Sequence, residues 1–194
     1  MVYIAVVSMG GQFNHLIARA VIDLGEEAEM VDMNASVSDV EKMGMDAMIF
    51  GGGPQSIGNE EAKLGNAGEM LKHCKVPALT MCLTHQLLAK VHGGKAGPAK
   101  EPEFGVIEII VDKEDEILKG MGPSFKTTES HNDEVIVLPS CMEALAHSSK
   151  CRYQVIRHRT KPLFGLQFHP ETKQGEKDEQ VFRNFLEICK KHKK

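Results

Sequence analysis

The sequence predicts an α/β fold, with one domain built around an open, mostly parallel central sheet flanked by helices. In the first half of the chain, apolar strand-like runs alternate with helix-like stripes, a spacing typical of parallel sheets covered on both faces. After Gly97, short strand-like runs separated by turns predict an additional small antiparallel sheet in the C-terminal half. The 194 residues, 42% of them hydrophobic, suit a single domain spanning 1–194.

The N-terminal half alternates regularly between the two kinds of element. A helix over His15–Leu24 is predicted by the apolar stripe of Leu16, Ala20, Val21 and Leu24, and Gly25 ends it. Ser36 is a candidate N-cap for a short helix ending near Gly44. Further helical segments are predicted at Glu60–Lys72, which is broken, and Gln86–His92. Strands are predicted at Val2–Met9, Glu29–Asp32, Asp46–Phe50 and Val76–Met81.

The C-terminal half contains shorter runs that favour antiparallel pairing. A final helix over Lys177–Lys190 is predicted to pack with Val181, Phe182, Phe185, Leu186 and Cys189 facing inward. Strands are predicted at Phe104–Val111, Phe125–Glu129, Glu134–Leu138, Tyr153–His158 and Leu163–Phe168.

Composition excludes several classes of function. A net charge of −4, no Trp and 5% aromatic residues argue against a nucleic-acid-binding surface. Five cysteines without a Cys-x-x-Cys pair argue against a disulfide framework and a zinc ribbon, so no metal is expected. The N-terminus lacks a signal-peptide pattern, and no apolar run approaches the roughly 20 residues of a membrane span. The expected location is the reducing cytoplasm, without a membrane partner.

Cys82 lies between the predicted strand Val76–Met81 and the helix that follows it. A sharp strand-to-helix turn exposes a side chain at the carboxyl edge of the sheet, where open α/β folds bind ligands. The positive end of the helix also favours a thiolate. Cys82 is therefore a candidate nucleophile, and an inert, packed cysteine is the alternative. Cys74, Cys141, Cys151 and Cys189 are expected to be structural.

The segment His169-Pro170-Glu171 supplies a candidate base and a candidate orienting carboxylate. Proline disfavours a helical conformation at His169, so that residue is predicted to be extended. In an extended chain Glu171 lies on the same side as the His169 ring and can fix its tautomer. The alternative is a turn with a partly exposed histidine. A thiol, an imidazole and a carboxylate together make a catalytic triad.

A glycine run, Gly51-Gly52-Gly53-Pro54, follows another predicted parallel strand and is expected at the same edge of the sheet. Its backbone N–H groups are candidate donors to a tetrahedral oxyanion. A simple turn is the alternative, and no Gly-Lys-[Ser/Thr] follows that would make it a phosphate loop.

Together these segments resemble the class I (triad-type) glutamine amidotransferases, and within them the separate glutaminase subunit of archaeal GMP synthase. The resemblance covers nearly the whole chain and implies a flavodoxin-like fold. The Ser-His-x-Asp segment indicates the GMP synthase branch. The motifs that carry the resemblance are Gly10–Ile17, Gly52–Ser56, the Cys82 turn, Ser130–Val135, Gly165–Glu171 and Asn184–Leu186.

The resemblance implies a role for each candidate residue. Cys82 would attack the glutamine side-chain amide, His169 would transfer protons and Glu171 would orient His169. The backbone N–H groups of Gly53 and Leu83 would form the oxyanion hole. The substrate-binding residues would be Gly52, Gln86, Ser130, His131, Asn132 and Asp133. His131 and Asp133 have two alternatives: signalling to a synthetase partner, or forming a polar turn between two strands.

One departure from the family concerns the turn around Cys82. The family's Gly-x-Cys-x-Gly-x-Gln has threonines at both glycine positions here, Thr80 and Thr84. Glycines relieve crowding in such a turn, and β-branched residues resist its backbone angles. The expected consequences are a strained turn, a re-aimed Cys82 or a narrower glutamine pocket.

The resemblance also implies a division of labour. The chain shows no Ser-Gly-Gly-x-Asp-Ser pyrophosphatase loop, so no ATP-pyrophosphatase domain is expected on it. No cofactor is expected on this chain either; ATP and Mg²⁺ are expected on a partner ATP-pyrophosphatase (synthetase) subunit that converts XMP to GMP with ammonia from L-glutamine. The alternatives are a non-catalytic or weakly active relative that binds glutamine or a partner, and a glutaminase serving another synthase.

Overall fold

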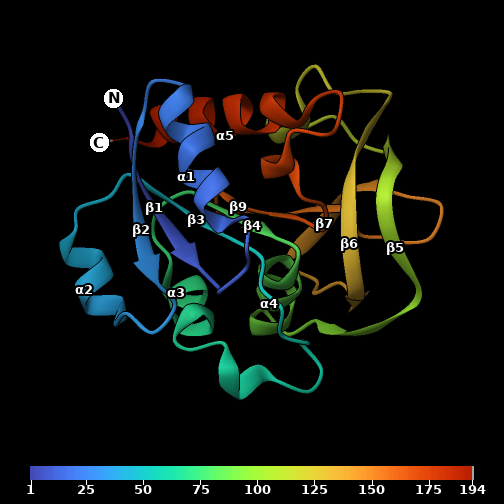
Figure 1. Ribbon diagram of the computed structural model, residues 1–194, viewed down its shortest axis with the longest axis horizontal. Coiled ribbons are helices and arrows are strands. Elements are labelled where there is room, and N and C mark those ends of the chain that lie inside the picture. The colour runs from blue at the N-terminus through green and yellow to red at the C-terminus, as the bar shows by residue number, and fades with distance from the viewer. Residues whose placement is uncertain (194) are drawn as a thin grey trace.

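The computed structural model describes residues 1–193, with the backbone alone at Glu61. A single nine-stranded mixed sheet crosses the molecule, with helices on both faces (Figure 1). The strand order is β2-β1-β3-β4-β9-β8-β7-β5-β6. The predicted single α/β fold is confirmed. In the described part of the chain, no helix combines the length and apolar character needed to cross a membrane.

The first five strands in this order are parallel to one another. They are β2 (Glu27–Asp32), β1 (Tyr3–Ser8), β3 (Ala47–Phe50), β4 (Ala78–Met81) and β9 (Leu163–Leu166). All four residues of β3, β4 and β9 are buried, as expected for strands covered on both faces. The last of them, β9, was predicted among the antiparallel strands, but it lies parallel to β4.

The antiparallel strands extend the same sheet instead of forming a second one. They are β5 (Lys95–Val111), β6 (Ser124–Val137), β7 (Met142–His147) and β8 (Val155–His158). Two strands predicted around Ser130–Asp133 are in fact the single strand β6, held by its pairing with β5. Strand β7 was not predicted, because its Met, Glu, Ala and Leu residues favour a helix; pairing with β5 and β8 overrides that propensity.

The helices cover the sheet in two groups (Figure 1). One face carries α1 (Asn14–Asp23) and α5 (Asp178–His192), and the other carries α2 (Val37–Lys42), α3 (Ala67–His73) and α4 (Leu83–Val91). Ser36 caps α2 as predicted, because its side chain accepts a hydrogen bond from Asp39 N. The inward residues predicted for α5 are all buried. Short 3₁₀ turns lie at Glu61–Lys63, Glu116–Leu118 and Pro170–Thr172.

This topology determines where functional side chains can meet. Because β1, β3, β4 and β9 are parallel neighbours, their carboxyl ends lie at one edge of the sheet. The segments that leave those ends begin at Met9, Gly51, Cys82 and Gln167. Ligands of open α/β sheets bind outside this edge.

Candidate active site

Cys82 occupies a strained turn between β4 and α4. Its backbone has φ 50° and ψ −109°, which places a non-glycine residue in the positive-φ region. Two hydrogen bonds hold this conformation: Cys82 N donates to Leu166 O at 2.8 Å, and Gln86 N donates to Cys82 O at 3.1 Å. Strain of this kind persists only where the surroundings fix it, and here it places the sulfur at the first turn of a helix.

The His169 ring lies between Cys82 and Glu171. Its Nδ1 is 2.8 Å from Glu171 Oε1, and its backbone N donates to Thr128 O at 2.9 Å. The predicted pairing of ring and carboxylate is therefore present, but the predicted extended chain is not its cause. Pro170–Thr172 form a 3₁₀ turn, which brings the buried Glu171 back beneath the ring.

Electrostatics at this ring favour its charged form. Burial by itself lowers the pKa of His169, but hydrogen bonds to Cys82 and Glu171, and the charges of both groups, raise that pKa to about 11. The ring can therefore stay protonated at neutral pH beside the Cys82 sulfur. An imidazolium next to a nucleophilic sulfur is the proton donor that a leaving amine requires.

A cavity of about 570 Å³ opens beside these three side chains. Each residue predicted for the oxyanion hole or for substrate binding lines it, as do Cys82, His169 and Glu171. Such a volume is within the usual range for small-molecule sites. The lining residues are 10–14, 52–56, 82, 83, 86, 128, 130–133, 169, 171 and 172.

The glycines after β3 leave room for the triad. A Cβ atom on Gly52 would lie 3.1 Å from His169 Cε1 and 3.5 Å from Cys82 Cβ, and one on Gly53 would lie 2.6 Å from Met9 O. Leu83 is the first residue of α4, so its N–H has no acceptor within the helix. The geometry is compatible with Gly53 and Leu83 as oxyanion donors, and their role stays a prediction.

Residues 130–133 form part of β6 and split between its two faces. All four line the cavity; Ser130 and Asn132 are exposed, and Cys82 Sγ lies 3.8 Å from Ser130 O. His131 and Asp133 point inward and are buried. The alternative of a polar turn is wrong, because these residues belong to a continuous strand.

Asp133 and Gln86 fasten the walls of the cavity to one another. Asp133 Oδ2 accepts hydrogen bonds from Ser56 Oγ at 2.6 Å and Ile57 N at 3.0 Å. The Gln86 amide donates to the Asp133 carbonyl at 2.6 Å. Both side chains are thus engaged with protein atoms, which favours a positioning role over direct contact with substrate.

Sequence reasoning did not single out two residues at this site, Gln167 and Asn14. Gln167 Nε2 lies 3.7 Å from Cys82 Sγ, and its Oε1 lies 3.3 Å from Gln86 Nε2. Asn14 Nδ2 donates to Gly11 O at 2.8 Å and to Gly52 O at 3.0 Å, which ties two cavity loops together. Both residues lie within motifs that carry the family resemblance, and that was the available signal.

Thr80 and Thr84 do not narrow the cavity, contrary to expectation. Both are fully buried and absent from its lining. Thr80 Oγ1 donates to Phe164 O at 3.1 Å. Thr84 Oγ1 accepts from Met81 N at 2.9 Å and lies 2.9 Å from Phe50 O, so it links β3 and β4 to the start of α4. The Thr84 hydroxyl therefore stabilises the turn that holds Cys82, and the Thr80 hydroxyl ties β4 to β9.

Replacing Thr84 with valine is expected to destabilise the fold by about 1–3 kcal/mol, because the buried Met81 N–H loses its acceptor. Thr80→Val is the matched control; it removes one donor to a carbonyl and should cost less. Urea unfolding of both variants measures the difference. Equal, small losses would show that the Thr84 hydroxyl does not hold the turn.

One buried group of side chains has the residue types of a metal site. The ligand atoms of Glu103, His131 and Cys151 lie within 4.8 Å of one another. Hydrogen bonds from Ser148 and Gln154 already reach both Glu103 oxygens, and burial raises the pKa of the Cys151 thiol strongly. These features disfavour metal binding, and the absence of a metal stays a prediction.

Comparison with known proteins places this geometry in context. Residues 5–189 match the family model described as glutamine amidotransferase class-I. A Sulfolobus acidocaldarius protein named as a glutamine-hydrolyzing GMP synthase subunit is 44% identical, over 97% of this chain and 99% of that protein. A Thermoplasma acidophilum crystal structure, described as a candidate GMP synthase subunit, superposes with a TM-score of 0.93 at 33% identity, covering 99% of this chain and 96% of that one. A Thermotoga maritima glutamine amidotransferase shares the fold, with a TM-score of 0.79 at 16% identity over 97% of each chain.

Proposed function

This chain belongs to the glutamine amidotransferase class-I family, and on that premise we propose that it is the glutaminase subunit of a two-subunit GMP synthase. Its reaction would hydrolyse L-glutamine to glutamate and ammonia. One observation carries the proposal: Cys82, His169 and Glu171, from segments far apart in the chain, meet at a cavity on the carboxyl edge of the sheet. The Sulfolobus relative named above supports the GMP synthase assignment.

The first half of the reaction forms a thioester. Cys82 Sγ adds to the amide carbon of the glutamine side chain, and the carbonyl oxygen becomes an oxyanion. The N–H groups of Gly53 and Leu83 are the proposed donors to that oxyanion, an effect worth about 3–4 kcal/mol per donor in measured hydrolases. His169 then transfers its proton to the nitrogen, the C–N bond breaks, and ammonia leaves.

The second half releases glutamate and restores the thiol. His169, now neutral, takes a proton from a water molecule as that water attacks the thioester carbon. The C–S bond breaks, glutamate departs, and the proton returns to the Cys82–His169 pair. Glu171, 2.8 Å from Nδ1, keeps the reacting nitrogen of the ring directed toward the sulfur and stabilises the charge on the imidazolium.

Substrate recognition is assigned to the cavity walls. Ser130 and Asn132 face the cavity from β6, and Gly52 allows the substrate to approach the triad closely. We assign the glutamine α-amino and carboxylate groups to this wall and its backbone. Gln86, His131 and Asp133 also line the cavity but would position its wall, because their own polar groups contact protein atoms.

A second chain follows from the same proposal, since a protein named as one subunit of a synthase functions beside another. We propose that the partner is the ATP-pyrophosphatase subunit, which would bind ATP and Mg²⁺, adenylate XMP and accept the ammonia. Nothing in the resemblance assigns a cofactor to the present chain.

The alternative of a non-catalytic relative loses its main support. It depended on Thr80 and Thr84 distorting the site, and both threonines lie outside the cavity lining, with their hydroxyls hydrogen bonded. A glutaminase serving another synthase would need the same triad. The identity of the partner therefore decides between GMP synthase and another synthase.

Reconstitution with the ATP-pyrophosphatase subunit of the same organism tests the proposal. With XMP, ATP and Mg²⁺ present, we expect glutamine to yield GMP only when both chains are mixed, whereas added ammonia should support the partner alone. Failure to hydrolyse glutamine in the mixture would favour a binding module. Glutamine hydrolysis without GMP, together with copurification of a different synthetase, would favour another synthase.

A further inference from the structure

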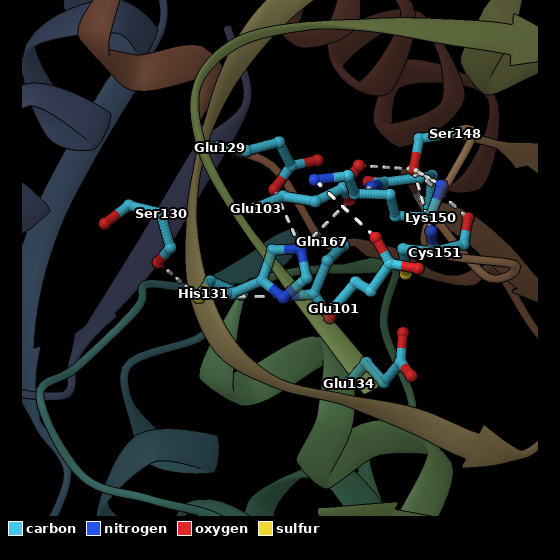
Figure 2. Close-up of polar contacts among 12 residues, drawn as sticks. Glu101, Glu103, Glu129, Ser130, His131, Glu134, Ser148, Lys150, Cys151 and Gln167 are labelled. Carbon is cyan, nitrogen blue, oxygen red and sulfur yellow. Dashed lines mark hydrogen bonds and ion pairs between the residues drawn. The ribbon is translucent and has the colours of Figure 1, made fainter. Parts of the chain in front are cut away.

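Behind the strand that forms one cavity wall lies a buried polar cluster that the proposed chemistry does not use. It contains Glu103 on β5, Glu129 and His131 on β6, and Ser148 between β7 and β8 (Figure 2). Gln154, from the same segment between β7 and β8, completes it. Glu103 is 1% exposed and His131 is 3% exposed. Buried charges at such positions require partners, so the contacts of each group show what the cluster does.

Glu103 is held by two donors from the segment between β7 and β8 and by the ring of His131 on β6. Its Oε1 accepts from Ser148 Oγ at 2.7 Å, and its Oε2 accepts from Gln154 Nε2 at 2.8 Å. The same Oε2 lies 3.2 Å from His131 Nε2, across the directly paired positions of β5 and β6. This carboxylate therefore fixes β6 relative to the rest of the antiparallel half of the sheet.

His131 faces acceptors at both ring nitrogens. Its Nδ1 is 3.0 Å from the Asp133 carbonyl, and its Nε2 faces Glu103 and, at 3.6 Å, Glu129. Burial and the nearby Glu103 charge raise the pKa of Glu129 well above its usual value. Through its two ring nitrogens, His131 links the Asp133 carbonyl to the Glu103 carboxylate.

The cluster connects to the nucleophile through a continuous series of hydrogen bonds. The Asp133 carbonyl that faces His131 also accepts from Gln86 Nε2, at 2.6 Å. Gln86 contacts Gln167, whose Nε2 reaches Cys82 Sγ at 3.7 Å. The side chain of Asp133 accepts hydrogen bonds from Ser56 and Ile57, which follow the proposed oxyanion donor Gly53 in the same loop. A displacement of His131 would therefore move two cavity walls at once.

We propose that Glu103 and His131 form a buried hydrogen-bonded clamp that positions Ser130–Asp133 of β6 against Cys82 and so sets the affinity of the cavity for glutamine. The two residues are positioning residues, because neither needs to touch the substrate. This inference rests on the proposed function, since it names what shapes the glutamine pocket. It extends that function to a residue, Glu103, outside the cavity lining.

The variant Glu103→Gln tests the clamp in the full-length chain with two alkylating probes of Cys82. A glutamine-analogue alkylator must occupy the pocket before it reacts, whereas iodoacetamide needs only an accessible thiolate. We expect the rate of labelling by the analogue to fall at least about tenfold in this variant, because the charge-assisted bond from Glu103 to His131 is lost. The rate of labelling by iodoacetamide should stay at the wild-type value. Glu101→Gln, an exposed position on the same strand, is the matched control and should change neither rate.

The outcomes separate the clamp from a purely structural role. Parallel losses of both rates together with a lowered melting temperature would show that Glu103 only supports the fold. Normal analogue reactivity in Glu103→Gln would also overturn the proposal. A wild-type chain that the analogue does not label would overturn the proposed function itself, and the clamp with it.

A double variant covers the case in which loss of one partner of this buried pair prevents folding. Glu103→Gln with His131→Gln replaces both partners, which proteins tolerate better than removing one partner of a buried pair. We expect this folded variant to keep its iodoacetamide reactivity and to lose reactivity toward the analogue. An unchanged analogue rate in the double variant would contradict the clamp.

Discussion

Replacing Cys82 with alanine is expected to reduce glutamine hydrolysis by about 10⁴-fold or more, because removal of the nucleophile disables a triad whose members act as a unit. The alanine keeps the backbone turn between β4 and α4, so the cavity should still form. Ammonia release from glutamine, measured with the partner subunit present, gives the size of the loss.

The same variant tests the division of labour between the two chains. Synthesis of GMP from added ammonia should continue at the wild-type rate, since the amination would occur on the partner. Cys141→Ala is the matched control, because Cys141 is half-buried and lies outside the cavity lining. If Cys82→Ala impaired both activities equally, the assignment of hydrolysis to this chain alone would be wrong.

Replacing Glu171 with glutamine is expected to lower kcat for glutamine hydrolysis by about 10²–10⁴-fold. This expected loss in kcat is based on the losses measured in other catalytic triads when the orienting carboxylate was replaced by an amide. Glutamine preserves the shape of the side chain but removes the charge that lies 2.8 Å from His169 Nδ1. Steady-state kinetics with the partner, alongside Glu176→Gln as an exposed control on the same loop, would measure the effect.

The pKa of His169 supplies a second measurement on this variant. Burial opposes protonation of the ring, while Cys82 and Glu171 together raise its pKa to about 11. Loss of the Glu171 charge should therefore lower that pKa, which NMR titration of the ring can detect. An unchanged pKa with normal kcat would remove Glu171 from the triad.

The sign of the associated stability change follows from linkage. A histidine whose pKa is raised by folding stabilises the folded state fully below its ordinary pKa of about 6.5. That contribution declines as the pH rises from about 6.5 toward the folded-state value of about 11. The stability gap between wild type and Glu171→Gln should therefore be largest near or below pH 6.5 and should narrow in alkaline solution.

Local sequence patterns predicted most of the elements, because burial and periodicity are local properties. The Ser36 cap and the buried side of α5 appear as expected. In α1, Ala20 and Val21 are buried as predicted, but Ile17 is buried instead of Leu16 and Leu24, which are half-buried. The failures occurred where pairing outweighed local preference. Helix-favouring residues form β7 between two neighbouring strands, and the polar stretch Ser130–Asp133 continues β6 because β5 pairs with it.

In the candidate site, too, local patterns predicted some residues, whereas long-range contacts decided others. Strand-to-turn junctions in the sequence marked Cys82, the glycines after β3 and the His169 segment as candidates, and the cavity is lined by residues from each of them. Gln167 and Asn14 were not selected, because an amide in a sequence carries no sign of what it will contact. Gln86 and Asp133 hydrogen bond cavity walls to one another, and these bonds also depend on partners distant in the chain.

The amino-acid sequence alone determined the chemistry: a thiol at a strand-to-helix turn, an imidazole with a carboxylate two residues later, and a strand–helix alternation that buries an α/β core. Tertiary structure decided that β9 enters the sheet beside β4, parallel to it, which brings His169 to Cys82 across 87 residues of chain. It also decided that the Thr84 hydroxyl stabilises the turn at Cys82 and that the Thr80 hydroxyl joins β4 to β9. The physical reason is that side-chain type and periodicity depend only on residues close together in the sequence, whereas strand order and hydrogen-bond partners depend on the packing of the whole chain.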